Sequence, residues 1–208
     1  VSVLPLESVR DWDKVGMKLI VPNSLGKPDY VATLEFLRTS PAILGHIEQP
    51  VVRAKVVSLC LVLAEQSPES SIALLAESPN LLRAVPSATW RLKLLQYGSL
   101  LAERHVDATI GYLRRAPELV QLLGEEPEAV SKFENWFTTG MEVLAYSPDA
   151  ARAFFAVESQ KALASVEQAL SGVPFRQVAR RVKLFVQGLC GADIAVTALS
   201  DSVTTEAR

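Results

Sequence analysis

Histidine and cysteine are the residues of this sequence that could provide acid–base, thiol or metal chemistry. The two histidines, His46 and His105, are far apart in the sequence, and His105 stands at a position typical of a helix cap. The two cysteines, Cys60 and Cys190, show neither a Cys-x-x-Cys pair nor a Cys/His metal spacing. Because Cys60 lies inside an apolar helical run, we expect it to be a buried, unreactive thiol.

Acidic residues gather at one place, where Glu125, Glu126 and Glu128 surround Pro127. Carboxylates are favoured at the start of a helix by its dipole, so we interpret the cluster as a helix start rather than a metal site. The sequence has no glycine-rich phosphate loop, no His-Glu-x-x-His zinc motif and no Gly-x-Ser-x-Gly elbow. We therefore expect no enzyme activity, no cofactor and no bound metal.

Composition limits the classes of partner. The chain has 208 residues, of which 49% are hydrophobic and 21% charged, and its formal net charge is −2. Proteins that bind a nucleic acid duplex usually carry a large basic excess, which is missing here. No apolar run reaches the roughly 18 residues that span a bilayer. The low cysteine content favours a reducing compartment, so we expect a cytoplasmic protein that binds neither nucleic acid nor membrane.

One short motif occurs three times at a constant spacing. The stretches "LRTSPAIL", "LAESPNLL" and "LRRAPELV" begin at Leu37, Leu75 and Leu113, so that successive copies are 38 residues apart. Periods of about 20 to 50 residues are typical of stacked repeat architectures. A fourth copy follows after a longer step, and a degenerate copy precedes the first.

Each repeat contains two amphipathic helical stretches. Residues 53–66 and 90–104 are predicted to be long helices, and Ser67-Pro68-Glu69 predicts the start of the helix that follows the first of these. Ser147 begins the same start signal later in the chain. The residue before a proline is disfavoured in the α conformation, so the Ser/Ala-Pro motif is predicted to end the second helix and open a third helix of one to two turns.

Small residues recur at one register of the long helices, at Gly16, Cys60, Gly98 and Gly140. Glycine inside a helix is unfavourable by about 0.5–1 kcal/mol relative to alanine, so its recurrence indicates that helices cross closely there. The tryptophans are predicted to pack in the core or between repeats rather than to form an exposed binding spot; they are Trp12, Trp90 and Trp136.

These patterns predict an all-α fold: a helical-repeat array that is α-solenoid-like (TPR/HEAT-like), with about four to five helix-hairpin units and a ~38-residue period. The repeat domain is expected to span residues 1–194, including helices at 161–172 and 173–191. Residues 195–208 lose the periodicity and are expected to form a linker or disordered tail.

Basic residues on two helices are the candidates for partner binding. One pair ends a short helix, with Arg38 and Arg83 nearby in the repeat pattern. A basic stripe with helical spacing follows near the end of the array. The stripe is either a solvated face or a docking surface for an acidic partner. The candidate residues are Arg114, Arg115, Arg176, Arg180, Arg181 and Lys183.

The stretch from Ser147 to Gly191, "SPDAARAFFAVESQKALASVEQALSGVPFRQVARRVKLFVQGLCG", resembles the helical region of NorD/CbbO-type proteins. Members of that family carry a C-terminal von Willebrand factor A domain and work with MoxR-type AAA+ ATPases. Their sequences in this region are similar to this stretch, and they contain repeated "A..FL..SP..L" units like those of this chain. In the family the ATPase does the mechanical work, and the von Willebrand domain engages rubisco or nitric oxide reductase through a metal-dependent adhesion motif.

The resemblance implies an adaptor whose helical region helps to hold the ATPase ring. No Asp-x-Ser-x-Ser adhesion motif follows Gly191, so no metal ligand is assigned, and a client-binding domain is expected either beyond Arg208 or not at all. Two other functions stay open. One is a general scaffold that binds peptides in a concave groove. The other is a small all-α enzyme or a HEAT-like DNA-repair protein, which the near-neutral charge disfavours.

Overall fold

The computed structural model describes residues 4–22, 24–124, 128–145 and 147–156. In these ranges eight helices and one short β-hairpin form two compact units, with the boundary after Gln121. The helices expected at 161–172 and 173–191, and the tail expected at 195–208, lie outside the described residues.

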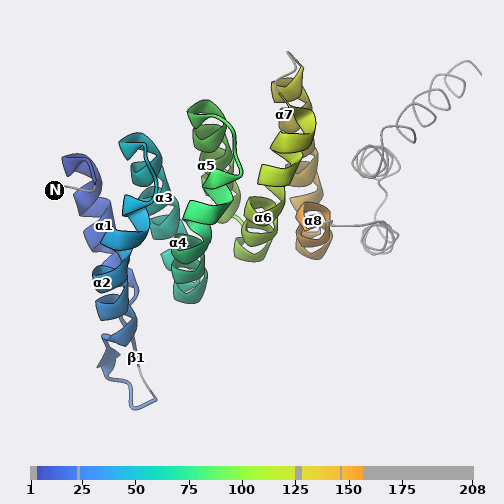
Figure 1. Cartoon of the computed structure of the whole chain (residues 1–208). Helices are drawn as coiled ribbons and strands as arrows, with labels where there is room; N and C mark the ends of the chain where they lie inside the picture. The colour runs from blue at the N-terminus through green and yellow to red at the C-terminus, as the bar shows by residue number, and fades with distance from the viewer. Residues whose placement is uncertain (1–3, 23, 125–127, 146, 157–208) are drawn as a thin grey trace, which may run out of the picture. The chain divides into compact units, whose positions relative to one another are not determined.

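The helices follow one another as antiparallel hairpins. They are α1 (Leu6–Lys18), α2 (Val31–Gly45), α3 (Pro50–Ala64), α4 (Pro68–Arg83), α5 (Ala88–Ala102), α6 (Val106–Leu123), α7 (Ala129–Leu144) and α8 (Pro148–Phe155). In the first unit α1 packs on α2 and α3 on α4; the hairpins then stack, with α1 on α3, α3 on α5, and α2 on α4 (Figure 1). The prediction of an all-α helical array is confirmed, whereas the 38-residue period itself stays a prediction.

Helix starts follow the local sequence signals. Ser67 and Ser147 each accept a backbone N–H, from Ser70 and Ala150 at 3.2 Å, and each is followed by a proline at the first helical position. His105 caps α6 in the same way, because its Nδ1 accepts the Ala108 N–H at 3.2 Å. A cap stabilises a helix by about 1 kcal/mol, since it satisfies a donor that has no partner within the helix. These predicted caps are confirmed.

The prediction that each Ser/Ala-Pro motif ends a helix is wrong. Pro41, Pro79 and Pro117 lie inside α2, α4 and α6, which continue beyond them, so in these three hairpins the motif opens no separate third helix. A proline removes one backbone hydrogen bond from the carbonyl four residues earlier. In α4 the Ser78 hydroxyl donates to that carbonyl, of Leu75, at 2.8 Å. The side chain before the proline thus replaces part of the lost bonding.

Burial explains why small residues precede these prolines. Ser40, Ser78 and Ala116 are all buried, at no more than 1% exposure. Ser40 also accepts a hydrogen bond from the Trp12 indole at 2.8 Å, which ties α2 to α1. The turn after each proline carries buried apolar residues such as Leu82. We infer that this burial offsets the roughly 3 kcal/mol that a proline inside a helix costs.

The small residues of the long helices do lie at close helix contacts. The Thr33 hydroxyl of α2 donates to the Gly16 carbonyl of α1 at 2.9 Å, and the Ser71 hydroxyl of α4 donates to the Cys60 carbonyl of α3 at 2.8 Å. Such short side chains reach a carbonyl on a neighbouring helix only where the two helices approach closely. The predicted close crossing is therefore present in the first two hairpins.

Each unit has its own core. In the first unit it consists mainly of aliphatic residues from α1 to α6, among them Leu59, Leu63 and Leu94. The Tyr112 hydroxyl donates to the Leu94 carbonyl at 3.0 Å, which joins α6 to α5. In the second unit it is aromatic. The ring of Trp136 lies 5.4 Å from Phe133 and 5.3 Å from Phe155, centroid to centroid. Trp90 and Trp136 are buried, as predicted.

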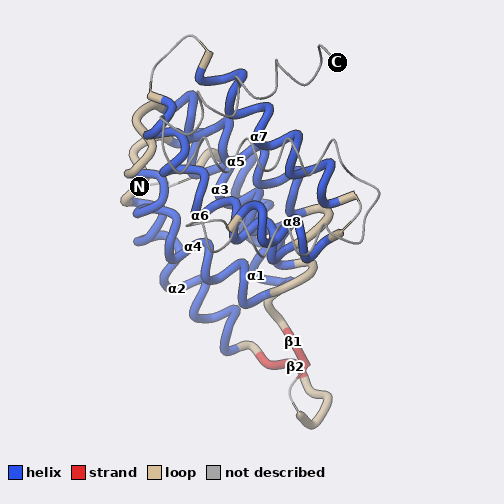
Figure 2. Tube along the Cα trace, turned by 90° about the vertical axis from the view of Figure 1, so that its right-hand side faces the viewer, coloured by secondary structure: helices blue, strands red, loops and turns tan. Residues whose placement is uncertain are grey.

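A β-hairpin between α1 and α2 has no counterpart in the predicted repeat. Strands β1 (Val21–Pro22) and β2 (Pro28–Asp29) pair antiparallel, with Val21 opposite Asp29. The turn between them includes Gly26, whose φ of 70° lies in the left-handed region that favours glycine. The hairpin projects away from the helices of the first unit (Figure 2).

Candidate functional site

Arg114 and Arg115, the first pair of predicted partner-binding residues, take part in ion pairs. Arg114 is exposed on α6 and forms a two-point contact with Glu77 of α4, in which Nε and Nη2 lie 3.2 and 2.9 Å from the two carboxylate oxygens. Arg115 is largely buried and pairs with Glu118 one turn later. Glu77 therefore offsets the positive charge of Arg114, and the contact joins the second hairpin to the third. A partner-binding role for either arginine stays a prediction.

The other four predicted binding residues lie outside the described residues, so the structure does not place them. They are Arg176, Arg180, Arg181 and Lys183. Among the acidic cluster predicted to start a helix, Glu128 stands at the N-cap position of α7, and its carboxylate lies 3.9 Å from the Lys132 ammonium. Glu125 and Glu126 also lie outside the described residues.

Exposed apolar side chains concentrate in the first hairpin. Of the ten large apolar side chains that are exposed in the described residues, six lie between positions 17 and 34. We call these six the N-terminal apolar surface: Met17, Val21, Leu25, Tyr30, Val31 and Leu34. The most exposed are Leu25 at 78%, Val31 at 71% and Met17 at 69%.

Three elements bring these residues to one end of the first unit. Met17 lies in the last turn of α1, Leu25 lies in the turn of the β-hairpin, and Val31 and Leu34 share a face at the start of α2. The hydrogen bond from Thr33 to Gly16 places the start of α2 beside the end of α1. No sequence pattern indicated this surface, because scattered apolar residues in a short connection carry no periodicity.

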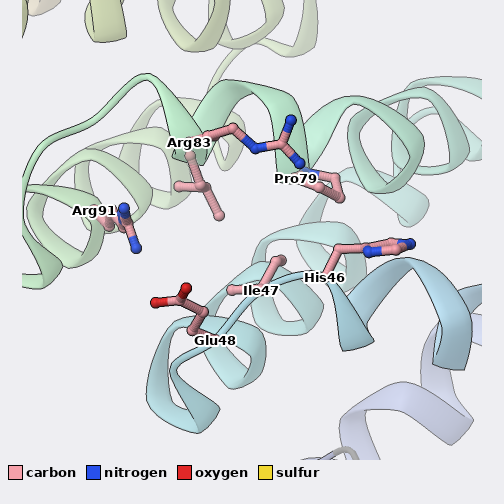
Figure 3. Close-up of a pocket in the computed structure, with 7 residues that line it drawn as sticks. His46, Ile47, Glu48, Pro79, Arg83 and Arg91 are labelled. Carbon is pink, nitrogen blue, oxygen red and sulfur yellow. The ribbon is translucent and has the colours of Figure 1, made fainter.

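A polar pocket opens elsewhere in the first unit, where α2 and α4 end side by side. We call it the Arg83 pocket. It has a volume of about 360 Å³ including its open mouth, and its lining includes His46 and Glu48 after α2, Pro79 and Arg83 of α4, and Arg91 of α5 (Figure 3). Figure 3 shows the carboxylate of Glu48 directed toward the guanidinium of Arg91.

The loops that form the pocket are fixed by two similar arginine contacts. Arg53 Nε donates to the Ile47 carbonyl, and 38 residues later Arg91 Nε donates to the Val85 carbonyl at 3.1 Å. Arg91 Nη1 also donates to the Gln49 side chain at 3.1 Å. Each arginine is thus hydrogen-bonded to the loop that precedes its own helix, and these bonds fix the loops that form the pocket wall.

Of the two cysteines, the structure describes Cys60, whereas Cys190 lies outside the described residues. Cys60 is fully buried, and burial raises the pKa of its thiol to about 12, while the contact with Ser71 acts in the opposite direction. The expectation that this thiol is buried is confirmed, whereas its lack of reactivity stays a prediction. Burial, and then the neighbouring Tyr97, raise the pKa of Tyr112 well above its usual value. Across the described ranges no three His, Cys, Asp or Glu side chains lie close enough to hold a metal ion.

The surface features are thus an apolar surface and a small basic pocket on a helical scaffold. None of the helices in the described ranges is both long and apolar enough to cross a membrane. Comparison of the chain with family models, with curated proteins and with solved structures finds no match.

Proposed function

We propose that this chain is a non-catalytic protein-interaction domain that acts as an adaptor for a MoxR-type AAA+ ATPase in the cytoplasm. In this role it resembles the ATPase-docking helical region of a protein that activates rubisco or nitric oxide reductase. The observation that carries the interaction role is the N-terminal apolar surface. Monomeric soluble proteins rarely leave such side chains grouped in contact with water, and exposed apolar patches mark sites of protein association.

The scaffold supports the proposal because the first hairpin is anchored on both helices. Trp12 and Thr33 form hydrogen bonds between α1 and α2, at 2.8 and 2.9 Å. In addition, α1 packs on α3, and α2 packs on α4. A surface that is held rigid before binding loses little conformational entropy when a partner docks. Identification of the partner as a MoxR-type ATPase is supported by the resemblance of the sequence from Ser147 onward.

The test compares two triple variants for binding to a purified MoxR-type ATPase from the same organism. The surface variant carries Met17→Ser, Val31→Ser and Leu34→Ser. The control carries Val9→Ser, Val51→Ser and Leu100→Ser, which remove exposed apolar side chains that are not part of this surface. Binding is measured by biolayer interferometry, and folding of each variant by circular dichroism.

The surface variant should bind at least about tenfold more weakly, since each apolar side chain that is buried in an interface contributes roughly 1 kcal/mol or more. The control should bind within about twofold of the unmodified chain. Absence of binding by the unmodified chain at about 50 µM would reject the ATPase partner. If short unrelated peptides bind the chain, and both triple variants change that binding equally, a general peptide-binding scaffold is favoured instead.

A further inference from the structure

Two successive helix stacks differ at one matched position. In the stack of α6 on α4, Gln121 lies four residues after Pro117 and donates through Nε2 to the carbonyl of Ala84, the C-cap of α4, at 2.7 Å. This hydrogen bond joins the end of α4 directly to α6. The corresponding position four residues after Pro79 is Arg83, and the corresponding C-cap, of α2, is His46.

In the stack of α4 on α2 the matched residues line the Arg83 pocket instead of closing the gap. The Arg83 side chain is exposed and makes no hydrogen bond or ion pair with the described part of the chain. Gln121 therefore bridges the ends of α4 and α6, whereas Arg83 at the matched position leaves a pocket between α2 and α4, with its guanidinium on the wall. Figure 3 shows Arg83 extended along the pocket above Pro79.

A second guanidinium in the pocket is held in a fixed position. Arg91 uses Nε for the Val85 carbonyl and Nη1 for the Gln49 side chain, and its Nη2 has no hydrogen-bond partner in the described ranges. Because arginine has five N–H donors, a guanidinium bound in this way can still donate to a ligand. Its orientation is already set, so little rotamer entropy is lost on binding.

The charges around the pocket favour an anion with one negative charge. Arg83 and Arg91 contribute two positive charges, and Glu48 contributes one negative charge on the facing wall. The pocket also lies where α2 and α4 end, and helix C-termini carry partial negative charge. The formal charges of these three side chains sum to +1, which the single negative charge of a carboxylate neutralises.

We propose that the Arg83 pocket binds the carboxylate of an acidic side chain, Asp or Glu, on the protein partner. The identity of the ligand as part of a protein rests on the proposed function, whereas the pocket lies on other elements than the N-terminal apolar surface. Arg91 provides the fixed donor, and Arg83 closes over the carboxylate. The pocket thereby adds charge selectivity to docking that the apolar surface drives.

The experiment titrates the full chain with an acetylated, amidated tetraglutamate peptide at low ionic strength, and NMR follows the arginine Nε–Hε signals. Arg83→Gln reproduces the residue at the matched position of the next stack, so it is expected to fold and to close the pocket. It should weaken peptide binding by about tenfold or more. Arg38→Gln removes an equal charge from an exposed arginine of α2 and should change binding by less than about twofold. Glu48→Gln should strengthen binding about threefold.

Three results would overturn the proposal. The first is an equal loss of peptide affinity in Arg83→Gln and Arg38→Gln. The second is the absence of a saturable shift of the Arg83 and Arg91 signals, and the third is tighter binding of inorganic phosphate than of the peptide. The titration contains no ATPase, so its failure leaves the test of the apolar surface intact. Loss of ATPase binding in the surface variant likewise leaves the peptide titration unchanged.

Discussion

Gly140 lies against the aromatic core of the second unit, and replacing it with alanine should destabilise that unit. A Cβ built at Gly140 overlaps the ring of Phe155 and lies 2.8 Å from Cε1 of Phe154. Both rings are buried, and Phe155 also packs against Trp136 at a centroid distance of 5.3 Å. The rings therefore have little room to move away from an added methyl group.

The expected magnitude follows from two opposing terms. Alanine gains about 1 kcal/mol over glycine in a helix interior. Overpacking of a filled core costs about 1–3 kcal/mol, and overlap with a confined ring belongs at the upper end of that range. We therefore expect Gly140→Ala to lower the free energy of unfolding by about 1–2 kcal/mol.

Gly16→Ala provides the matched control at the same register of α1. A Cβ there lies 3.4 Å from Leu37 Cδ2 and 3.8 Å from Thr33 Cγ2, which is ordinary van der Waals contact. This substitution should stabilise the first unit by about 1 kcal/mol, because only the helix-propensity gain applies.

Native-state hydrogen exchange measures both effects, because protected amides of α7 and α1 report the opening free energies of their own units. The double variant Gly140→Ala with Phe155→Leu should recover part of the loss in α7, since the smaller side chain makes room for the methyl group. Equal stabilisation by Gly140→Ala and Gly16→Ala would refute the reasoning.

Three further predictions concern single side chains of the first unit. Ser67→Ala should lower the free energy of unfolding by about 1 kcal/mol in urea titrations, whereas the exposed Ser24→Ala should leave it unchanged. Tyr112→Phe should also cost about 1 kcal/mol, because a buried hydrogen bond is lost, and Tyr30→Phe serves as its exposed control. Folding raises the pKa of the Cys60 thiol from 9.0 to about 12, because burial favours the neutral, protonated form. Its contribution to stability is therefore complete below pH 9.0 and is lost as pH rises toward about 12. Urea titrations at several pH values should show a steeper fall above pH 9.0 in the unmodified chain than in Cys60→Ala; equal slopes would contradict the burial effect.

Local signals in the sequence predicted the helix starts well. Ser67 and Ser147 each precede a proline and an acidic residue, and the physics of such a cap needs no tertiary contact. His105 stands 38 residues after Ser67, which predicts a cap there as well, although no proline follows it. The all-α class followed from helical periodicity, because the apolar stripes of these segments must be buried against one another.

The proline motif shows where local reasoning fails. A proline disfavours a continuing helix locally, yet Pro79 lies inside α4 because Ser78 bonds the carbonyl of Leu75 and the following turn is buried. These are tertiary and side-chain effects that a dipeptide rule omits. The N-terminal apolar surface and the Arg83 pocket likewise depend on which residues stacking leaves exposed, and a single sequence does not specify that.

The central claim is that the first hairpin is the docking element for an ATPase. Hydrogen exchange of the full chain, measured by mass spectrometry with and without a MoxR-type ATPase, tests it most directly. Binding should slow exchange in peptides that cover Gly16 to Glu35, which include the β-hairpin and the start of α2. Protection confined to other helices, or no change at saturating ATPase, would contradict the claim.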